Sequence, residues 1–96
     1  MTTQVEISMN DDWGQTKTIE IEDVVRELFI ETFAGDLDRY FIKKDIGRVM
    51  KVVVGRFKKG KYDVATTNTI LGYLLSIAHI LEEEKYSSFK FINTLT

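Results

Sequence analysis

The sequence contains no cysteine and no proline, and it has only one histidine and one tryptophan. Without cysteine, disulfide bonds and thiolate metal sites are excluded. A histidine-based metal site would need carboxylates as all of its further ligands, so we expect no metal and no cofactor. The lack of cysteine also suits a reducing compartment, and we expect a cytoplasmic protein.

Motifs of catalysis and targeting are also missing. There is no Walker loop, no Gly-x-Gly-x-x-Gly, no His-Glu-x-x-His and no nucleophile elbow. The only nucleophile near His79 on a helix is Ser76, one turn earlier, and a serine at this spacing from a histidine is common by chance. The first residues lack the basic and apolar regions of a signal peptide. The longest uncharged run, 64–81, is too polar and a little short for a membrane span. We expect a protein that is not an enzyme and has no membrane partner.

The residues that are present predict one small α+β domain over 1–96. The 96 residues are 44% apolar, which is enough for one hydrophobic core. The chain opens with two stretches of alternating apolar residues around a turn-forming segment that contains Gly14, and this pattern is typical of a β-hairpin. The alternating apolar residues are Val5, Ile7 and Met9, followed by Ile19 and Ile21, which share their face with Lys17.

After the hairpin the apolar residues recur with the period of a helix. Val25, Leu28, Phe29 and Phe33 predict a first helix that ends at Gly35. Asp36 is expected to cap a short amphipathic turn that contains Leu37, Tyr40 and Phe41. A long helix from about 64 to 85 follows Asp63 as its cap, and alternation of Phe89, Phe91 and Leu95 indicates a third strand. The expected fold is therefore an N-terminal β-hairpin followed by two or three helices and a possible short C-terminal strand.

The segment 52–64 allows two structures. Ile46, Val49, Met50, Val53 and Phe57 follow helical spacing, with Gly60 as the stop. The three valines at 52–54 and the Lys59-Gly60 pair instead favour a β-hairpin. We favour the helix because five positions match its period, and the hairpin stays open.

Charge is strongly segregated along the chain. Residues 1–38 hold ten acids and two bases, while 39–61 hold nine bases and the single acid Asp45. On a helix, the outer face of this second segment is basic, and it comprises Lys44, Arg48, Lys51, Lys58 and Lys59. Such a face is a solvated surface, a site for an acidic protein partner or a second copy, or a site for nucleic acid. The net charge of −2 and the lack of a base-reading motif make nucleic acid the weaker of the two binding interpretations.

Side chains outside the expected core are candidates for partner contact. The long helix is apolar nearly all round, which is typical of a central helix or of one that a partner covers. We assign Tyr73 and Ile80 to its side away from the core, and Trp13 to a loop tip, as candidate contact residues. Val53 and Phe57 are expected in the core with Leu71 and Leu75. A strip of small and polar residues is expected to let another helix pack closely, and it consists of Asn68, Gly72, Ser76 and His79.

These observations favour a small interaction protein, such as an adaptor, an inhibitor or an assembly subunit, that binds a protein partner or dimerises. A nucleic-acid-binding module that uses 39–61 is one alternative. A homo-oligomeric structural subunit is the other.

Overall fold

The computed structural model describes residues 2–9, 16–82 and 86–92 and shows an α+β fold. Strand β1 (Thr2–Met9) pairs antiparallel with β2 (Thr16–Glu22) on one side and with β3 (Tyr86–Phe91) on the other, in the order β2-β1-β3. Between the hairpin and β3 come α1 (Asp23–Thr32), α2 (Lys43–Lys58) and α3 (Val64–Glu82). The N-terminal hairpin, the helices and the C-terminal strand are confirmed.

Alternation of side chains gives the sheet one buried face. Val5 of β1 lies opposite Ile19 of β2 and Phe91 of β3, and Ile7 lies opposite Phe89. Val5, Ile7 and Phe89 have no exposed surface, because residues two apart on a strand point to the same side. The helices cover this face, and the other face is left to solvent.

An aromatic cluster joins α1 to the sheet. Phe29 is fully buried, and its ring centroid lies 5.2 Å from that of Phe41, 5.8 Å from that of Phe89 and 5.0 Å from that of Phe91. All three pairs are edge-to-face, which is a favoured arrangement of aromatic rings. This cluster is therefore the centre of the core.

The segment between α1 and α2 is not the short helical turn that the sequence suggests. Phe41 instead pairs with Phe89 as a β-bridge, in which each backbone N–H donates to the other residue's carbonyl at 2.7 and 2.9 Å. Burial of the Phe41 ring between β3 and α1 outweighs local helix propensity here. Asp36 consequently caps no helix, and α1 ends two residues before Ala34, which has a φ of +55°.

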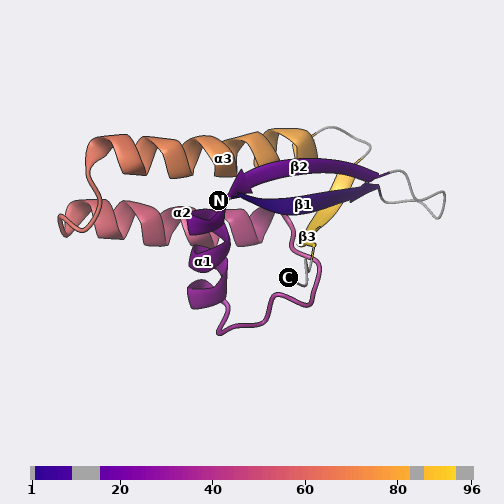
Figure 1. The fold of residues 1–96 in the computed structure, drawn as a ribbon, viewed down its shortest axis with the longest axis horizontal. Helices are drawn as coiled ribbons and strands as arrows, with labels where there is room; N and C mark the ends of the chain where they lie inside the picture. Colours follow the sequence, from indigo (N-terminus) through magenta and orange to yellow (C-terminus); the bar gives the residue numbers. More distant parts are fainter. Residues whose placement is uncertain (1, 10–15, 83–85, 93–96) are drawn as a thin grey trace.

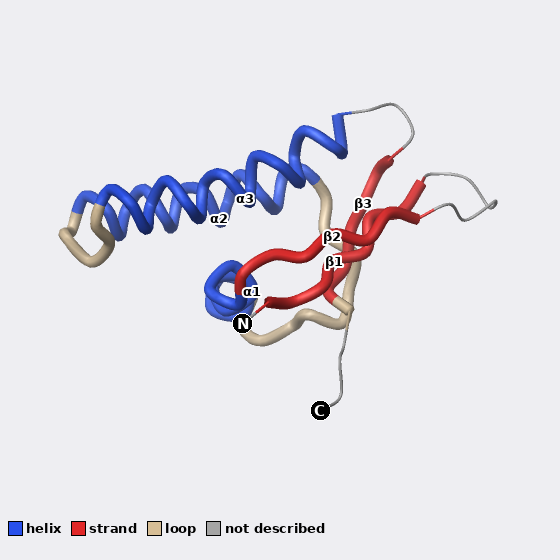
Figure 2. The backbone as a smooth tube through the Cα atoms, turned by 45° about the horizontal axis from the view of Figure 1, so that its top comes forward, coloured by secondary structure: helices blue, strands red, loops and turns tan. Residues whose placement is uncertain are grey.

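Helices α2 and α3 form an antiparallel helical hairpin that extends away from the sheet (Figure 1). They lie side by side in both views, and α1 runs across them near the sheet (Figures 1 and 2). Lys43 at the start of α2 pairs with Glu82 at the end of α3 at 2.6 Å, which fixes the sheet-proximal end of the hairpin. At the distal end neither α1 nor the sheet covers the two helices, so their outer sides are exposed.

Candidate interaction site on the helical hairpin

Local signals at both ends make 43–58 one continuous helix. The Asp45 carboxylate accepts a hydrogen bond of 2.9 Å from the Ile42 backbone N–H and so satisfies a free donor at the helix start. At the other end Gly60 has a φ of +77°. The Lys61 N–H donates to the Arg56 carbonyl at 2.9 Å and the Gly60 N–H to the Phe57 carbonyl at 3.0 Å, which is a Schellman stop. The helix prediction for 52–58 is confirmed, and the hairpin alternative is wrong.

All five residues of the predicted basic surface are exposed, but they are not equivalent. Arg48 is held over the Phe33 ring at 4.9 Å and therefore helps to join α2 to the end of α1. Lys44, Lys51 and Lys58 are spaced by seven residues, so they lie in one row along the outer side of α2, about 10.5 Å apart. We call these three residues the lysine row. Lys59 follows at the helix C-cap.

Several other bases of 39–61 are used inside the fold. Arg39 pairs with Asp45 at 3.1 Å, and Lys43 pairs with Glu82. Arg56 donates to both Glu31 and Tyr62. The bond to Lys43 lowers the pKa of Glu82, and the bonds to Glu31 and Tyr62 raise the pKa of Arg56. By contrast, no residue of the lysine row forms an ion pair with any residue that the structure describes.

A line of exposed apolar side chains runs beside the lysine row. Its members are exposed by 39%, 42%, 61% and 58%, and they are Val54 and Phe57 of α2 and Val64 and Leu75 of α3. We call them the outer seam, because they border the junction of α2 with α3. The Lys43–Glu82 pair and the turn at Gly60 set the antiparallel pairing, which places Phe57 close to Val64.

Two shallow depressions show that apolar, basic and small side chains share this surface. One is lined by Lys51, Val54 and Lys58, together with Gly55 and Met50. The other lies on α3 and includes Gly72, Leu75 and His79. The outer face of the hairpin therefore has a basic side on α2, an apolar centre, and a side of small residues on α3.

The sequence prediction for the core is wrong at Phe57 and Leu75. Val53 is fully buried, as expected, and Leu71 is only partly buried against the core, but the other two residues belong to the outer seam. Phe57 keeps the helical spacing but is the second-last residue of α2, whose C-terminal end lies away from the sheet (Figure 1). Leu75 is misplaced because α3 is apolar nearly all round, so that the pattern does not identify which side is buried.

The predicted contact residues Tyr73 and Ile80 do not lie on an open face. Both are partly buried and pack against the core. The buried side of α3 is instead Thr67, Ile70, Leu74, Ile77 and Leu81, and Tyr73 and Ile80 flank it. Trp13 lies outside the described residues.

The strip Asn68, Gly72, Ser76 and His79 is exposed rather than packed against another helix of this chain. The Ser76 hydroxyl donates to the Gly72 carbonyl at 2.9 Å. A Cβ atom built on Gly72 would meet no atom within 4 Å. The α3 side of the outer face is thus smooth enough for close approach by another chain.

Two further properties concern the class of site. Among the described residues, no group of three or more histidines and carboxylates is arranged to hold a metal ion. By length and composition alone, α3 is apolar enough to cross a membrane, contrary to the expectation from 64–81, although a core helix of a globular protein passes the same test.

Comparisons with protein-family models, with curated proteins and with solved structures found no match to this chain.

Proposed function

We propose that this chain is a small, non-enzymatic interaction protein that binds an acidic amphipathic helix of a protein partner on the outer face of α2 and α3. One observation carries the proposal: exposed Val54 of the outer seam shares a shallow depression with Lys51 and Lys58, which form no ion pair with any described residue. Contiguous apolar surface next to charge is typical of a binding groove, and apolar anchors supply affinity while charges select the partner.

The charge of the face favours an acidic partner over a second copy of the chain. The described α2–α3 hairpin presents Glu82 as the only acidic side chain of α3, at its sheet-proximal end and paired with Lys43. Two copies that met through this face would bring one lysine row near the other without acids between them. Like charges in such a contact are unfavourable.

Nucleic acid is a weaker candidate for the same surface. Phosphates would be neutralised by the lysine row, but the exposed side chains of Val54, Phe57 and Leu75 offer them no partner. The exposed acid Glu27 of α1 also lies in the same small chain and repels a polyanion.

Two synthetic peptides test the proposal. Each is an amphipathic helix of about 18 residues, or five turns, with the same leucine stripe. The first carries glutamates on its polar face and the second carries lysines. Fluorescence anisotropy should show that the acidic peptide binds with a dissociation constant on the order of 1–100 μM, and that the basic peptide binds at least about tenfold more weakly.

Charge reversal at the lysine row provides the variant. Lys51→Glu with Lys58→Glu should weaken the acidic peptide at least about tenfold and strengthen the basic one, because the sign of the face changes. Lys17→Glu on β2 is the matched control and should change neither affinity. Equal binding of both peptides would contradict the proposal. Tight duplex binding that is lost in the double variant would favour the nucleic-acid function, and a dimer that Leu75→Gln disrupts would favour self-association.

A further inference from the structure

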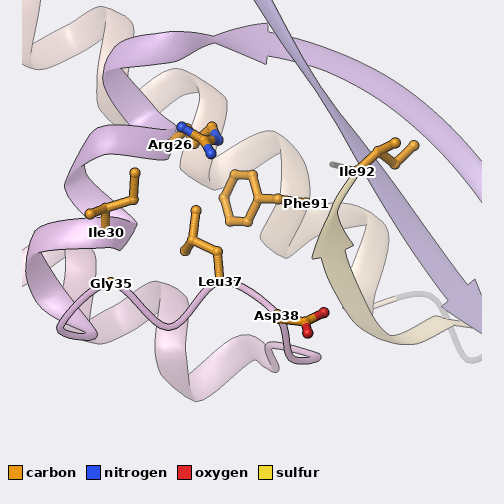
Figure 3. Close-up of a pocket in the computed structure, with 7 residues that line it drawn as sticks. All are labelled: Arg26, Ile30, Gly35, Leu37, Asp38, Phe91 and Ile92. Carbon is orange, nitrogen blue, oxygen red and sulfur yellow. The ribbon is translucent and has the colours of Figure 1, made fainter. Parts of the chain in front are cut away.

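A separate pocket lies on the other side of the core, between α1, the loop that follows it and the end of β3 (Figure 3). Its volume is about 260 Å³. Ligand pockets for drug-sized molecules are usually about 300–1,000 Å³, so this pocket suits a smaller molecule.

One part of the pocket lining is apolar. Ile30 of α1, Leu37 of the loop and Phe91 of β3 line it, and Leu37 points toward the space between the other two (Figure 3). Phe91 is only 7% exposed, and its ring packs on that of Phe29, with ring centroids 5.0 Å apart. The Phe91 part of the wall therefore belongs to the aromatic core, whereas Ile30 and Leu37 are partly buried.

One charged group of each sign completes the lining. Arg26 of α1 lies near the Phe91 ring (Figure 3). Asp38 lies on the loop after Leu37, on the side of the pocket away from Arg26 (Figure 3). Among the described residues, Arg26 forms no ion pair and no side-chain hydrogen bond. It is the only arginine in 1–38, a segment with ten acids. None of the described acids of this segment forms an ion pair with it.

We infer that this pocket binds a small organic monocarboxylate with an apolar body. The Arg26 guanidinium presents parallel N–H donors whose spacing matches the two oxygens of a carboxylate. Ile30, Leu37 and Phe91 hold the apolar body. The negative charge of Asp38 disfavours a ligand with a second carboxylate or a phosphate at the loop side of the pocket. This inference is independent of the proposed function, because no residue of the pocket belongs to the outer face of α2 and α3.

Methyl-detected NMR titration tests the pocket in the wild-type protein. The probes are 4-methylpentanoate, its neutral amide, and succinate as a dicarboxylate. We expect 4-methylpentanoate to shift the Ile30 and Leu37 methyl signals, with a dissociation constant on the order of 0.1–10 mM for so few heavy atoms. The amide and succinate should bind at least about tenfold more weakly, since the amide lacks the charge that Arg26 recognises and succinate meets Asp38.

Two variants test the roles of the charged groups. Arg26→Gln should weaken 4-methylpentanoate at least about tenfold, whereas Lys17→Gln, another base of the acidic segment, should leave the affinity unchanged. Asp38→Asn should strengthen succinate relative to 4-methylpentanoate. The pocket proposal is overturned if the amide binds as well as the acid or if Arg26→Gln leaves the affinity for 4-methylpentanoate unchanged. It is also overturned if no methyl signal shifts at about 20 mM 4-methylpentanoate, which is roughly twice the largest dissociation constant expected.

Discussion

Replacement of two phenylalanines by alanine distinguishes the outer face of the helical hairpin from the core. Phe29 has no exposed surface and contacts the rings of Phe41, Phe89 and Phe91. Phe29→Ala removes these contacts and leaves a cavity, so the free energy of unfolding should fall by about 3–5 kcal/mol. A domain of this size is stable by only about 5–15 kcal/mol, and the variant should be close to unfolding.

Phe57→Ala should cost much less. The Phe57 side chain is 42% exposed, so a little more than half of the transfer free energy of about 1.5–3 kcal/mol for a buried side chain is lost. No cavity forms, because the site is open to water. The expected loss is about 1–2 kcal/mol.

Urea unfolding followed by far-ultraviolet circular dichroism measures both losses on one scale. The two variants remove the same atoms from helices of the same chain, so they control for each other. A loss at Phe57 that equals or exceeds the loss at Phe29 would show that the outer seam is part of the core and would remove the basis of the proposed binding face.

Three further substitutions give expected outcomes. Gly72→Ala should raise the free energy of unfolding, measured in urea, by about 0.5–1 kcal/mol, because the new Cβ meets no atom. It should also weaken binding of the acidic peptide, measured by anisotropy, about fivefold or more, because the methyl group blocks close approach to α3. Unchanged peptide affinity would place the peptide elsewhere. Ala34→Gly should raise the free energy of unfolding by about 0.5–1 kcal/mol, because the residue has a φ of +55°, while Ala65→Gly, the helical control, should lower it. Asp63 accepts hydrogen bonds from Thr66, which hold its pKa below the usual value, so its stabilisation of α3 is present above about pH 4 and is lost as pH falls through the lower folded pKa. Asp63→Ala should reduce this dependence of the melting temperature on acid pH. An unchanged pH profile would mean that the Asp63 cap contributes nothing to stability.

Local patterns were sufficient to predict most of the secondary structure. Alternation at Val5, Ile7, Phe89 and Phe91 identified the strands, and Asp63 was predicted correctly as the cap of α3. These predictions succeed because each pattern and its cap depend on residues close in sequence.

The candidate sites were less predictable, since they depend on contacts between distant residues. The buried side of α3 is set by what packs on it, and its sequence is apolar on several sides. The bridge of Phe41 to Phe89 and the pocket of Arg26 with Phe91 join residues far apart in the chain. One signal of the outer seam was present: Val54 is an apolar residue outside the main stripe of α2, beside lysines.

The central claim is that an acidic helix binds on the outer face of α2 and α3, and methyl-detected NMR of the wild-type protein with the acidic peptide tests it most directly. The account predicts the largest shifts and direct peptide contacts at the exposed methyl groups of Val54, Val64 and Leu75, with small changes at the buried methyl groups of Val49, Ile70 and Leu74. Peptide contacts confined to the sheet or to α1, with the three exposed methyl groups unaffected, would contradict the account.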